Sequence, residues 1–253
     1  MNEERMFHIG IKKDTGIEYA ILPGDPGRVD KIAEYLKEPT FLAENREFRS
    51  VAGYIGNTRV IVTSTGIGGP SAAIALEELA VCGVKTAIRV GTCGAMQEKI
   101  VPGDLIIPVA AVRMEGTSKE YAPIEYPAAA DLDVTIALKN ACNRLDVSYF
   151  TGVVQSKDSF YGQHSPERMP VYYELENKWE AWKRLGVLAS EMETAALFTV
   201  SRTLDIRCGC ILHALWNQER KKAGLIDSDS FDTDIAIKAA VYAICELSGE
   251  NNE

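Results

Sequence analysis

The stretch Gly24-Asp25-Pro26-Gly27-Arg28 decides the fold, because of the segments on either side of it. Before it, residues 17–22 form an apolar run typical of a buried strand, and after it apolar residues recur at helical spacing to about residue 36. Proline is favoured in the first turn of a helix, so Pro26 marks a helix start. A strand that enters a helix through such a turn is the basic unit of an α/β protein.

Two further glycine-rich stretches repeat this arrangement. Residues 65–70 (TGIGGP) follow a predicted strand over 60–64 and precede an alanine-rich helix over 71–81, and residues 89–94 (RVGTCG) end a predicted strand over 86–90. Glycine lets a main chain approach an anion closely, and an arginine guanidinium can bind two oxygens at once. Neither the Gly-Lys-Ser/Thr ending of a nucleoside triphosphate loop nor the Gly-x-Gly-x-x-Gly of dinucleotide binders occurs at these turns. The two turns that carry Arg28 and Arg89 therefore predict a pocket for a free oxyanion such as phosphate.

Strands and helices alternate along the rest of the chain. We predict strands over residues 104–112, 152–156 and 207–215, and helices over 131–145, 173–184, 192–204 and from about 231. Continuous apolar strands between helices indicate a mostly parallel sheet that is covered on both faces. No linker or internal repeat interrupts the pattern, so we expect one domain over residues 1–253. Its ligand should bind beyond the carboxyl ends of the strands.

Composition narrows the possible partners. Of the 253 residues, 46% are hydrophobic and 25% charged, which is ordinary for a soluble globular protein. The net charge of −9 and the pI near 5.0 argue against nucleic acid and anionic membranes, since both attract positive surfaces. No signal peptide or membrane helix is expected, and the expected location is the cytoplasm.

The cysteines and histidines predict no metal site. The six cysteines are scattered without Cys-x-x-Cys spacing and mostly have apolar neighbours, among which a reduced cysteine behaves as a small hydrophobe. Cys208-Gly209-Cys210 alternates as a buried strand would, and the three histidines are widely separated.

Four motifs together resemble the nucleoside phosphorylase-I family. They are Gly24-Asp25-Pro26-x-Arg28, residues 64–71 (STGIGGPS), residues 89–94 (RVGTCG) and Glu191-Met192-Glu193, in the order and spacing of that family. The similarity covers nearly the whole chain, and within the family the chain looks like the uridine phosphorylases. The resemblance implies a single-domain, three-layer α/β/α sandwich with a mixed, mostly parallel central sheet. It also implies a pentosyltransferase of pyrimidine salvage, which reversibly converts uridine and phosphate to uracil and ribose 1-phosphate.

For phosphate, the family's positions match Gly24, Arg28, Arg89 and Thr92, with Arg46 similar to an arginine lent by a neighbouring subunit. Three arginines repel one another, and this repulsion is relieved when a dianion enters. From the residues alone, Arg28 and Arg89 could equally well serve only to cap or salt-bridge local structure.

For ribose, Glu193 resembles the family residue that accepts the 2′ and 3′ hydroxyls, with Met192 against the sugar and Glu191 nearby. Two carboxylates at positions i and i+2 do not share a helix face, so Glu191 and Glu193 are not a simple acid/base pair. The resemblance also matches His8 to a histidine that reaches the 5′-hydroxyl across a dimer interface.

For the base, the decisive segment is residues 160–168 (FYGQHSPER). The resemblance implies that Gln163 reads uracil, that Phe160 stacks near the sugar or ring, and that a nearby arginine stabilises the leaving anion. The family arginine lies two residues after the glutamine, but Ser165 stands there and the next arginine is Arg168. Pro166 could let the loop bulge and bring Arg168 to the base, or Arg168 could be a solvated loop charge.

Other functions stay open on the sequence. Purine enzymes of the family carry an aspartate where this chain has Gln218, and glutamine cannot protonate a base, which favours a pyrimidine. Trp216 also differs from familiar uridine enzymes. The alternatives are a related phosphorylase or hydrolytic nucleosidase that acts on another nucleoside, such as a purine or a broad range of pyrimidines, and a non-catalytic nucleoside sensor.

The resemblance further implies the assembly and the co-substrate. No cofactor is expected, since inorganic phosphate is itself the nucleophile, and no metal is expected in the site. Some relatives hold a monovalent cation between subunits, at positions that match Glu47, Ile67 and Ser71. We expect a homo-oligomer, at least a dimer because of His8 and Arg46, and the family suggests a hexamer.

Overall fold

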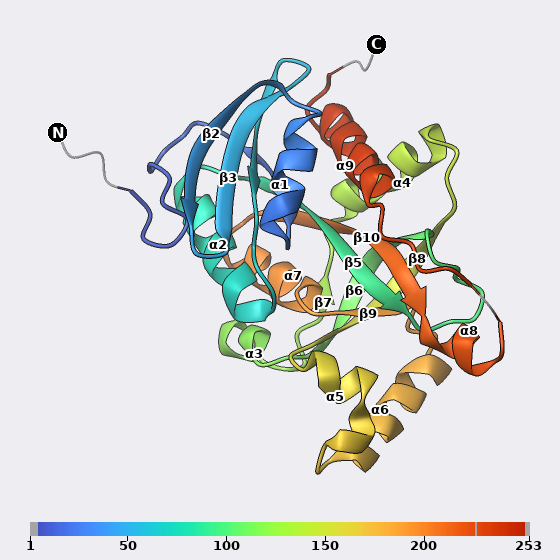
Figure 1. The fold of residues 1–253 in the computed structure, drawn as a ribbon. Coiled ribbons are helices and arrows are strands. Elements are labelled where there is room, and N and C mark those ends of the chain that lie inside the picture. Colours follow the sequence, from blue (N-terminus) through green and yellow to red (C-terminus); the bar gives the residue numbers. More distant parts are fainter. Residues whose placement is uncertain (1–4, 226, 251–253) are drawn as a thin grey trace.

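The computed structural model describes residues 5–225 and 227–250, and Figure 1 shows their arrangement around a twisted sheet. The strands are β1 (Tyr19–Pro23), β2 (Lys37–Asn45), β3 (Phe48–Ile55), β4 (Thr58–Thr63), β5 (Thr86–Ala95), β6 (Leu105–Met114), β7 (Ala128–Ala129), β8 (Tyr149–Lys157), β9 (Ala189–Glu191) and β10 (Arg207–Asn217). The helices are α1 (Pro26–Ala33), α2 (Gly69–Val81), α3 (Thr117–Tyr121), α4 (Leu132–Arg144), α5 (Phe160–His164), α6 (Tyr172–Arg184), α7 (Thr194–Thr203), α8 (Gln218–Lys222) and α9 (Asp234–Leu247), with a 3₁₀ turn over Pro166–Arg168.

The sheet is mixed, with parallel pairing at its centre. β1 pairs in parallel with β4 and β5, and β5 pairs in parallel with β10. On one side β4, β3 and β2 continue as an antiparallel meander. On the other side β10 pairs with β6, β6 with β8, β8 with β9, and β9 with β5 again. These five strands therefore close into a ring within the mixed sheet.

Alternate side chains of β1 point into two different cores, and this produces the three layers. Ala20 and Leu22 belong to a core that includes residues of α2 and α7, whereas Ile21 belongs to a second core formed with α1, α4 and α9. Figure 1 shows these helices on opposite faces of the sheet, with α5 and α6 extending from one end. The α/β class and the mixed sheet covered by helices are as predicted.

Several boundaries differ from the predictions for local reasons. The third glycine-rich stretch, residues 89–94, is no turn: β5 continues to Ala95 because it pairs with both β10 and β9 there. The helix predicted from residue 192 begins at Thr194, because the Glu191 carboxylate accepts the backbone N–H groups of Glu193 and Thr194. The terminal helix begins at Asp234 instead of near residue 231.

Two features considered in the sequence analysis are the cysteines and the apolar character of the helices. All six cysteines are buried, and none of them forms a disulfide within the described residues. In the part of the chain that the structure covers, no helix has the length and apolar character needed to cross a membrane.

Candidate active site

A pocket of about 610 Å³ lies where the carboxyl ends of β1, β5 and β8 meet the turn that precedes α2 and the turn that precedes α7. Its walls include eight of the residues predicted for the site: Gly24, Arg28, Arg89, Thr92, Phe160, Glu191, Met192 and Glu193. Residues far apart in sequence are thus brought together at the sheet edge where ligands of α/β proteins bind.

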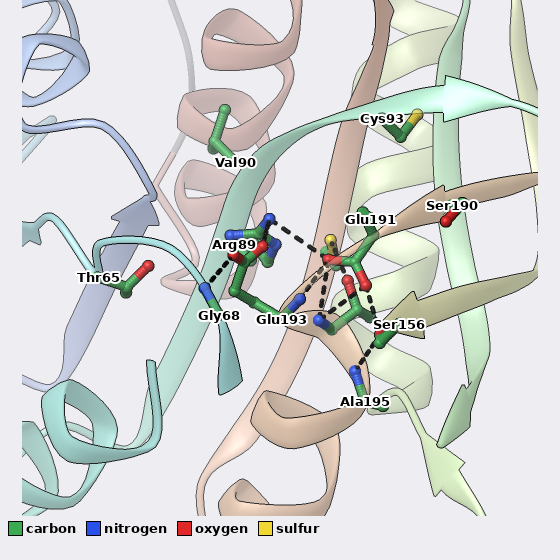
Figure 2. Close-up of polar contacts among 12 residues, drawn as sticks. Thr65, Gly68, Arg89, Val90, Cys93, Ser156, Ser190, Glu191, Glu193 and Ala195 are labelled. Atoms are coloured by element: carbon green, nitrogen blue, oxygen red, sulfur yellow. Dashed lines mark hydrogen bonds and ion pairs between the residues drawn. The ribbon is translucent and has the colours of Figure 1, made fainter. Parts of the chain in front are cut away.

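Arg89 projects from β5 and is only 3% exposed. Its Nη2 donates to Glu193 Oε2 and lies 3.3 Å from Glu191 Oε2, as Figure 2 shows. Its Nε and Nη1 are buried and have no hydrogen-bond partner among the described residues. Burial lowers the pKa of Arg89, but the two carboxylates more than offset this and hold the pKa above its ordinary value. The guanidinium is therefore charged, and its two unpaired N–H groups could donate to an anion.

Glycines around Arg89 give it room. A Cβ on Gly91 would meet Arg89 Nη2 at 2.8 Å and Leu212 Cδ2 at 2.6 Å, and a Cβ on Gly94 would meet Trp216 Nε1 at 2.8 Å. The glycines of residues 89–94 thus keep a strand clear of side chains at the pocket wall, instead of forming a turn.

Arg28 supplies a second cation from the first turn of α1. Its Nη1 donates to the carbonyl oxygen of Val90 at 3.2 Å, and the Asp25 side chain caps the helix by accepting the Gly27 N–H at 2.9 Å. Burial and the charge of Arg89 lower the pKa of Arg28. Two neighbouring guanidinium groups at one end of the pocket could together bind a multiply charged anion.

The two carboxylates have different hydrogen-bond partners, as Figure 2 shows. Glu191 accepts the Ser156 hydroxyl and the N–H groups of Glu193 and Thr194, the last two at 2.9 Å, and so it caps α7. Glu193 is held by Arg89 through Oε2 and by the Gly68 N–H through Oε1 at 2.6 Å. Burial raises the pKa of Glu193 although Arg89 opposes this. Glu191 thus caps α7, Glu193 is fixed by Arg89 and Gly68, and both carboxylates line the pocket.

The other end of the pocket is aromatic. The Phe160 ring lies 4.3 Å from the His164 ring and 6.3 Å from the Trp216 ring, measured between centroids. Burial and the charge of Lys157 lower the pKa of His164, so this ring is neutral at pH 7. These rings form a surface on which a planar base could stack.

The two residues predicted to recognise the base, Gln163 and Arg168, lie in different surroundings. Gln163 lines an adjoining cavity of about 690 Å³, which shares Lys157 and His164 with the first. Gln163 Oε1 accepts the Ser190 hydroxyl at 2.5 Å, while its Nε2 is buried without a partner in the described chain. Arg168 is exposed and lines neither cavity, because its guanidinium lies over the Tyr161 ring, 5.6 Å from the centroid.

The residues expected to act across subunits lie outside the pocket. His8 Nδ1 is 2.7 Å from Glu78 Oε1, and Arg46 is exposed with a φ of 55° in the turn between β2 and β3. Of the residues matched to a cation site, Ser71 donates to Glu47 Oε1 at 2.8 Å and Ile67 is 79% exposed. Within the described ranges, no group of three or more histidine, cysteine, aspartate or glutamate side chains is placed to hold a metal ion.

Cys93, Lys157, His164 and Ser190 are among the pocket residues to which the sequence analysis gave no role. Lys157 is the last residue of β8, and its place at a carboxyl end was the only signal that could have found it. Cys93 and Ser190 lie within strands, where small residues are typical of a core.

Several known nucleoside phosphorylases are similar to this chain over most of its length. A uridine phosphorylase of Treponema pallidum is 50% identical over 94% of this chain and 92% of its own length. A uridine phosphorylase of Thermococcus kodakarensis is 44% identical over 88% of this chain and 81% of its own, and a guanosine phosphorylase of Halorubrum lacusprofundi is 39% identical over 81% and 80%. The family model described as the phosphorylase superfamily matches residues 18–245. The chain therefore belongs to the phosphorylase superfamily.

Proposed function

We propose that this protein is a pentosyltransferase that reversibly converts uridine and phosphate to uracil and ribose 1-phosphate. The observation that carries this proposal is the pair of unpartnered N–H groups of Arg89, buried beside Arg28 and next to Glu193. The uridine phosphorylases among its relatives, 50% and 44% identical over most of the chain, support the same reaction.

Phosphate would bind at the Arg28 and Arg89 end, with Gly24 and Thr92 beside it. One of its oxygens forms a bond to C1′ of the ribose while the C1′–N1 bond breaks, and the electron pair stays on the base. The sugar becomes cation-like during this exchange. A fixed carboxylate such as Glu193 stabilises that positive charge, and it can also accept the ribose 2′ and 3′ hydroxyls beside Met192.

The aromatic end would take the base. Phe160 offers a stacking face, and the unpartnered Nε2 of Gln163 offers a donor to a carbonyl oxygen. Arg168 would reach the base only after the loop that carries it moved away from Tyr161.

The wider setting is part of the same proposal. His8 and Arg46 would complete the site of a neighbouring copy, which requires at least a dimer and is compatible with a hexamer. The protein would act in cytoplasmic pyrimidine salvage, with phosphate as co-substrate and no cofactor. A monovalent cation would bind between subunits near Glu47, Ile67 and Ser71.

A purine nucleoside is a second candidate substrate. The guanosine phosphorylase among the relatives and the adjoining cavity of about 690 Å³ at the base end favour it. The test is a panel of uridine, thymidine, inosine and guanosine, each with phosphate, in which the released base is identified. Uridine should have the highest kcat/KM, and turnover of guanosine or inosine alone would contradict the uridine assignment.

A further inference from the structure

Lys157 is a buried ammonium group in the same pocket, on the side of the aromatic rings. The residue is 4% exposed, and its Nζ lies 6.0 Å from the centroid of the Phe160 ring. Nζ donates to Ser190 Oγ at 2.8 Å. Among the described residues this neutral hydroxyl is its only hydrogen-bond partner, and no carboxylate lies within ion-pair distance of it.

The nearest carboxylates are committed to other groups. Glu191 is occupied by Ser156 and by the start of α7, and Glu193 by Arg89 and Gly68. A buried charge without a counter-ion is costly, and proteins seldom keep one unless a ligand supplies the opposite charge. Arg28 and Arg89 already supply positive charge for phosphate. The negative charge that would compensate Lys157 is therefore expected on the other substrate.

We infer that the Lys157 ammonium contacts a carbonyl oxygen of the departing pyrimidine and neutralises the negative charge that develops there. This inference rests on the proposed phosphorolysis. When the C1′–N1 bond breaks, its electron pair delocalises from N1 onto the carbonyl oxygens O2 and O4. The interaction of an ammonium donor with either oxygen is stronger in the transition state, where that oxygen carries more negative charge, than in the ground state. Such an interaction accelerates the reaction.

Lys157 also begins a hydrogen-bond chain that orients Gln163. Nζ donates to Ser190 Oγ, and Ser190 donates to Gln163 Oε1 at 2.5 Å. The amide oxygen of Gln163 is thereby engaged, and its unpartnered Nε2 is the atom left for the ligand. Two donors, Nζ and Nε2, would then serve the two carbonyl oxygens of uracil.

The arginine that the family resemblance places near the base is absent from this pocket. Ser165 stands at its position, and Arg168 lies over Tyr161 outside both cavities. Lys157 thus supplies, from the end of a rigid strand, the positive charge that the loop does not deliver.

The test compares Lys157→Met with wild type on uridine and 5-fluorouridine. Fluorine withdraws electrons and stabilises the departing base, so this substrate needs less help from the protein. We expect kcat/KM for uridine to fall by about 10²-fold or more, and for 5-fluorouridine by a clearly smaller factor, with the KM for phosphate within about twofold. Lys238→Met, which removes an ammonium paired with Asp234 at 2.8 Å on α9, is the matched control and should keep wild-type rates.

A second variant separates charge from shape. Lys157→Arg keeps a positive charge to high pH, whereas burial lowers the pKa of Lys157 to about 8. In wild type, kcat/KM for uridine should fall as the pH rises through about 8, and in Lys157→Arg this fall should be absent. The groups that face Lys157 are Cys93 from β5, Glu191 and Glu193 from β9 and the start of α7, and His164 from α5. All four groups are present in both proteins, so a difference between the two pH profiles is due to the titration of Lys157.

The outcomes are distinct. If wild type releases no uracil from uridine, the proposed function fails, whatever the variants do. If wild type is active and Lys157→Met stays within about threefold of it, or loses the same factor on both substrates, Lys157 does not stabilise the leaving base.

Discussion

Arg89 is held on one side by Glu191 and Glu193 and has two N–H groups without partners on the other. If these groups hold the attacking phosphate, Arg89→Ala should lower phosphate-dependent turnover of uridine by about 10²-fold or more. Steady-state kinetics with varied phosphate measures the loss. Arg184→Ala removes an exposed arginine paired with Glu180 and should leave the rate unchanged, while near-normal turnover by Arg89→Ala would refute the assigned phosphate site.

Lys157 should reduce the stability of the unliganded protein. A pKa that falls from 10.5 to about 8 corresponds to about 3 kcal/mol against the charged form. Because the folded state holds this proton less tightly than the unfolded state does, the penalty is full below about pH 8 and is relieved as the pH rises toward 10.5. Lys157→Met should therefore melt at a higher temperature than wild type at pH 7, with a difference that shrinks above pH 8. A lower melting temperature at pH 7 would contradict this reading.

Single residues were predictable where a local pattern marked them. Arg28 directly follows a glycine turn between a strand and a helix, and Glu193 lies in a short motif, so both were expected in the pocket where they are found. Lys157 had no such mark, because a lysine at the end of an apolar run usually ends a strand at the surface. Lys157 is buried because residues of α5 and β9 pack around it, and this packing depends on the tertiary fold.

At the scale of elements, β10 packs on α4 through a glycine. A Cβ on Gly209 would lie 2.4 Å from Val134 Cγ1 and 3.1 Å from Val134 Cβ. Gly209→Ala should therefore destabilise the protein by about 1–3 kcal/mol through overpacking, visible as a lower melting temperature. A Cβ on Gly116 has its nearest contact at 3.6 Å, so Gly116→Ala is the control, and equal melting temperatures for the two variants would contradict the packing argument.

Elements with one clear periodicity were predicted, and those without one were not. The buried strands β1, β4, β6 and β10 and the helices α2, α4 and α6 lie close to their expected places. β2 was missed because it is largely exposed and its sequence, KEPTFLAEN, is mostly polar and contains a proline. β9 is only three residues long, and its pairing with β5 and β8 could not be derived from its own sequence.

At the scale of the whole molecule, the ring of β5, β10, β6, β8 and β9 sets one wall of the pocket. The sequence predicts strands but not that β9 returns to β5, since such closure depends on long-range pairing. This closure brings Glu191 and Ser190 beside Arg89 and Lys157.

A shared site between copies has a direct test. Arg46→Ala and Arg89→Ala should each be impaired, but a mixed dimer would hold one pocket with both arginines, Arg89 from one chain and Arg46 from the other. If the variants are co-refolded in equal amounts, about a quarter of the wild-type rate should return. Activity no higher than the mean of the two variants would show that Arg46 does not act across an interface.

The central claim is that phosphate, and not water, attacks the ribose in this pocket. The direct measurement is the rate of uracil release from uridine as phosphate is raised from zero, with the sugar product identified. If phosphate attacks, the rate saturates with phosphate and ribose 1-phosphate forms in equal amount to uracil. Without phosphate, no more than about a hundredth of the saturated rate should remain. Uracil release at the same rate without phosphate, with free ribose as the product, would contradict it.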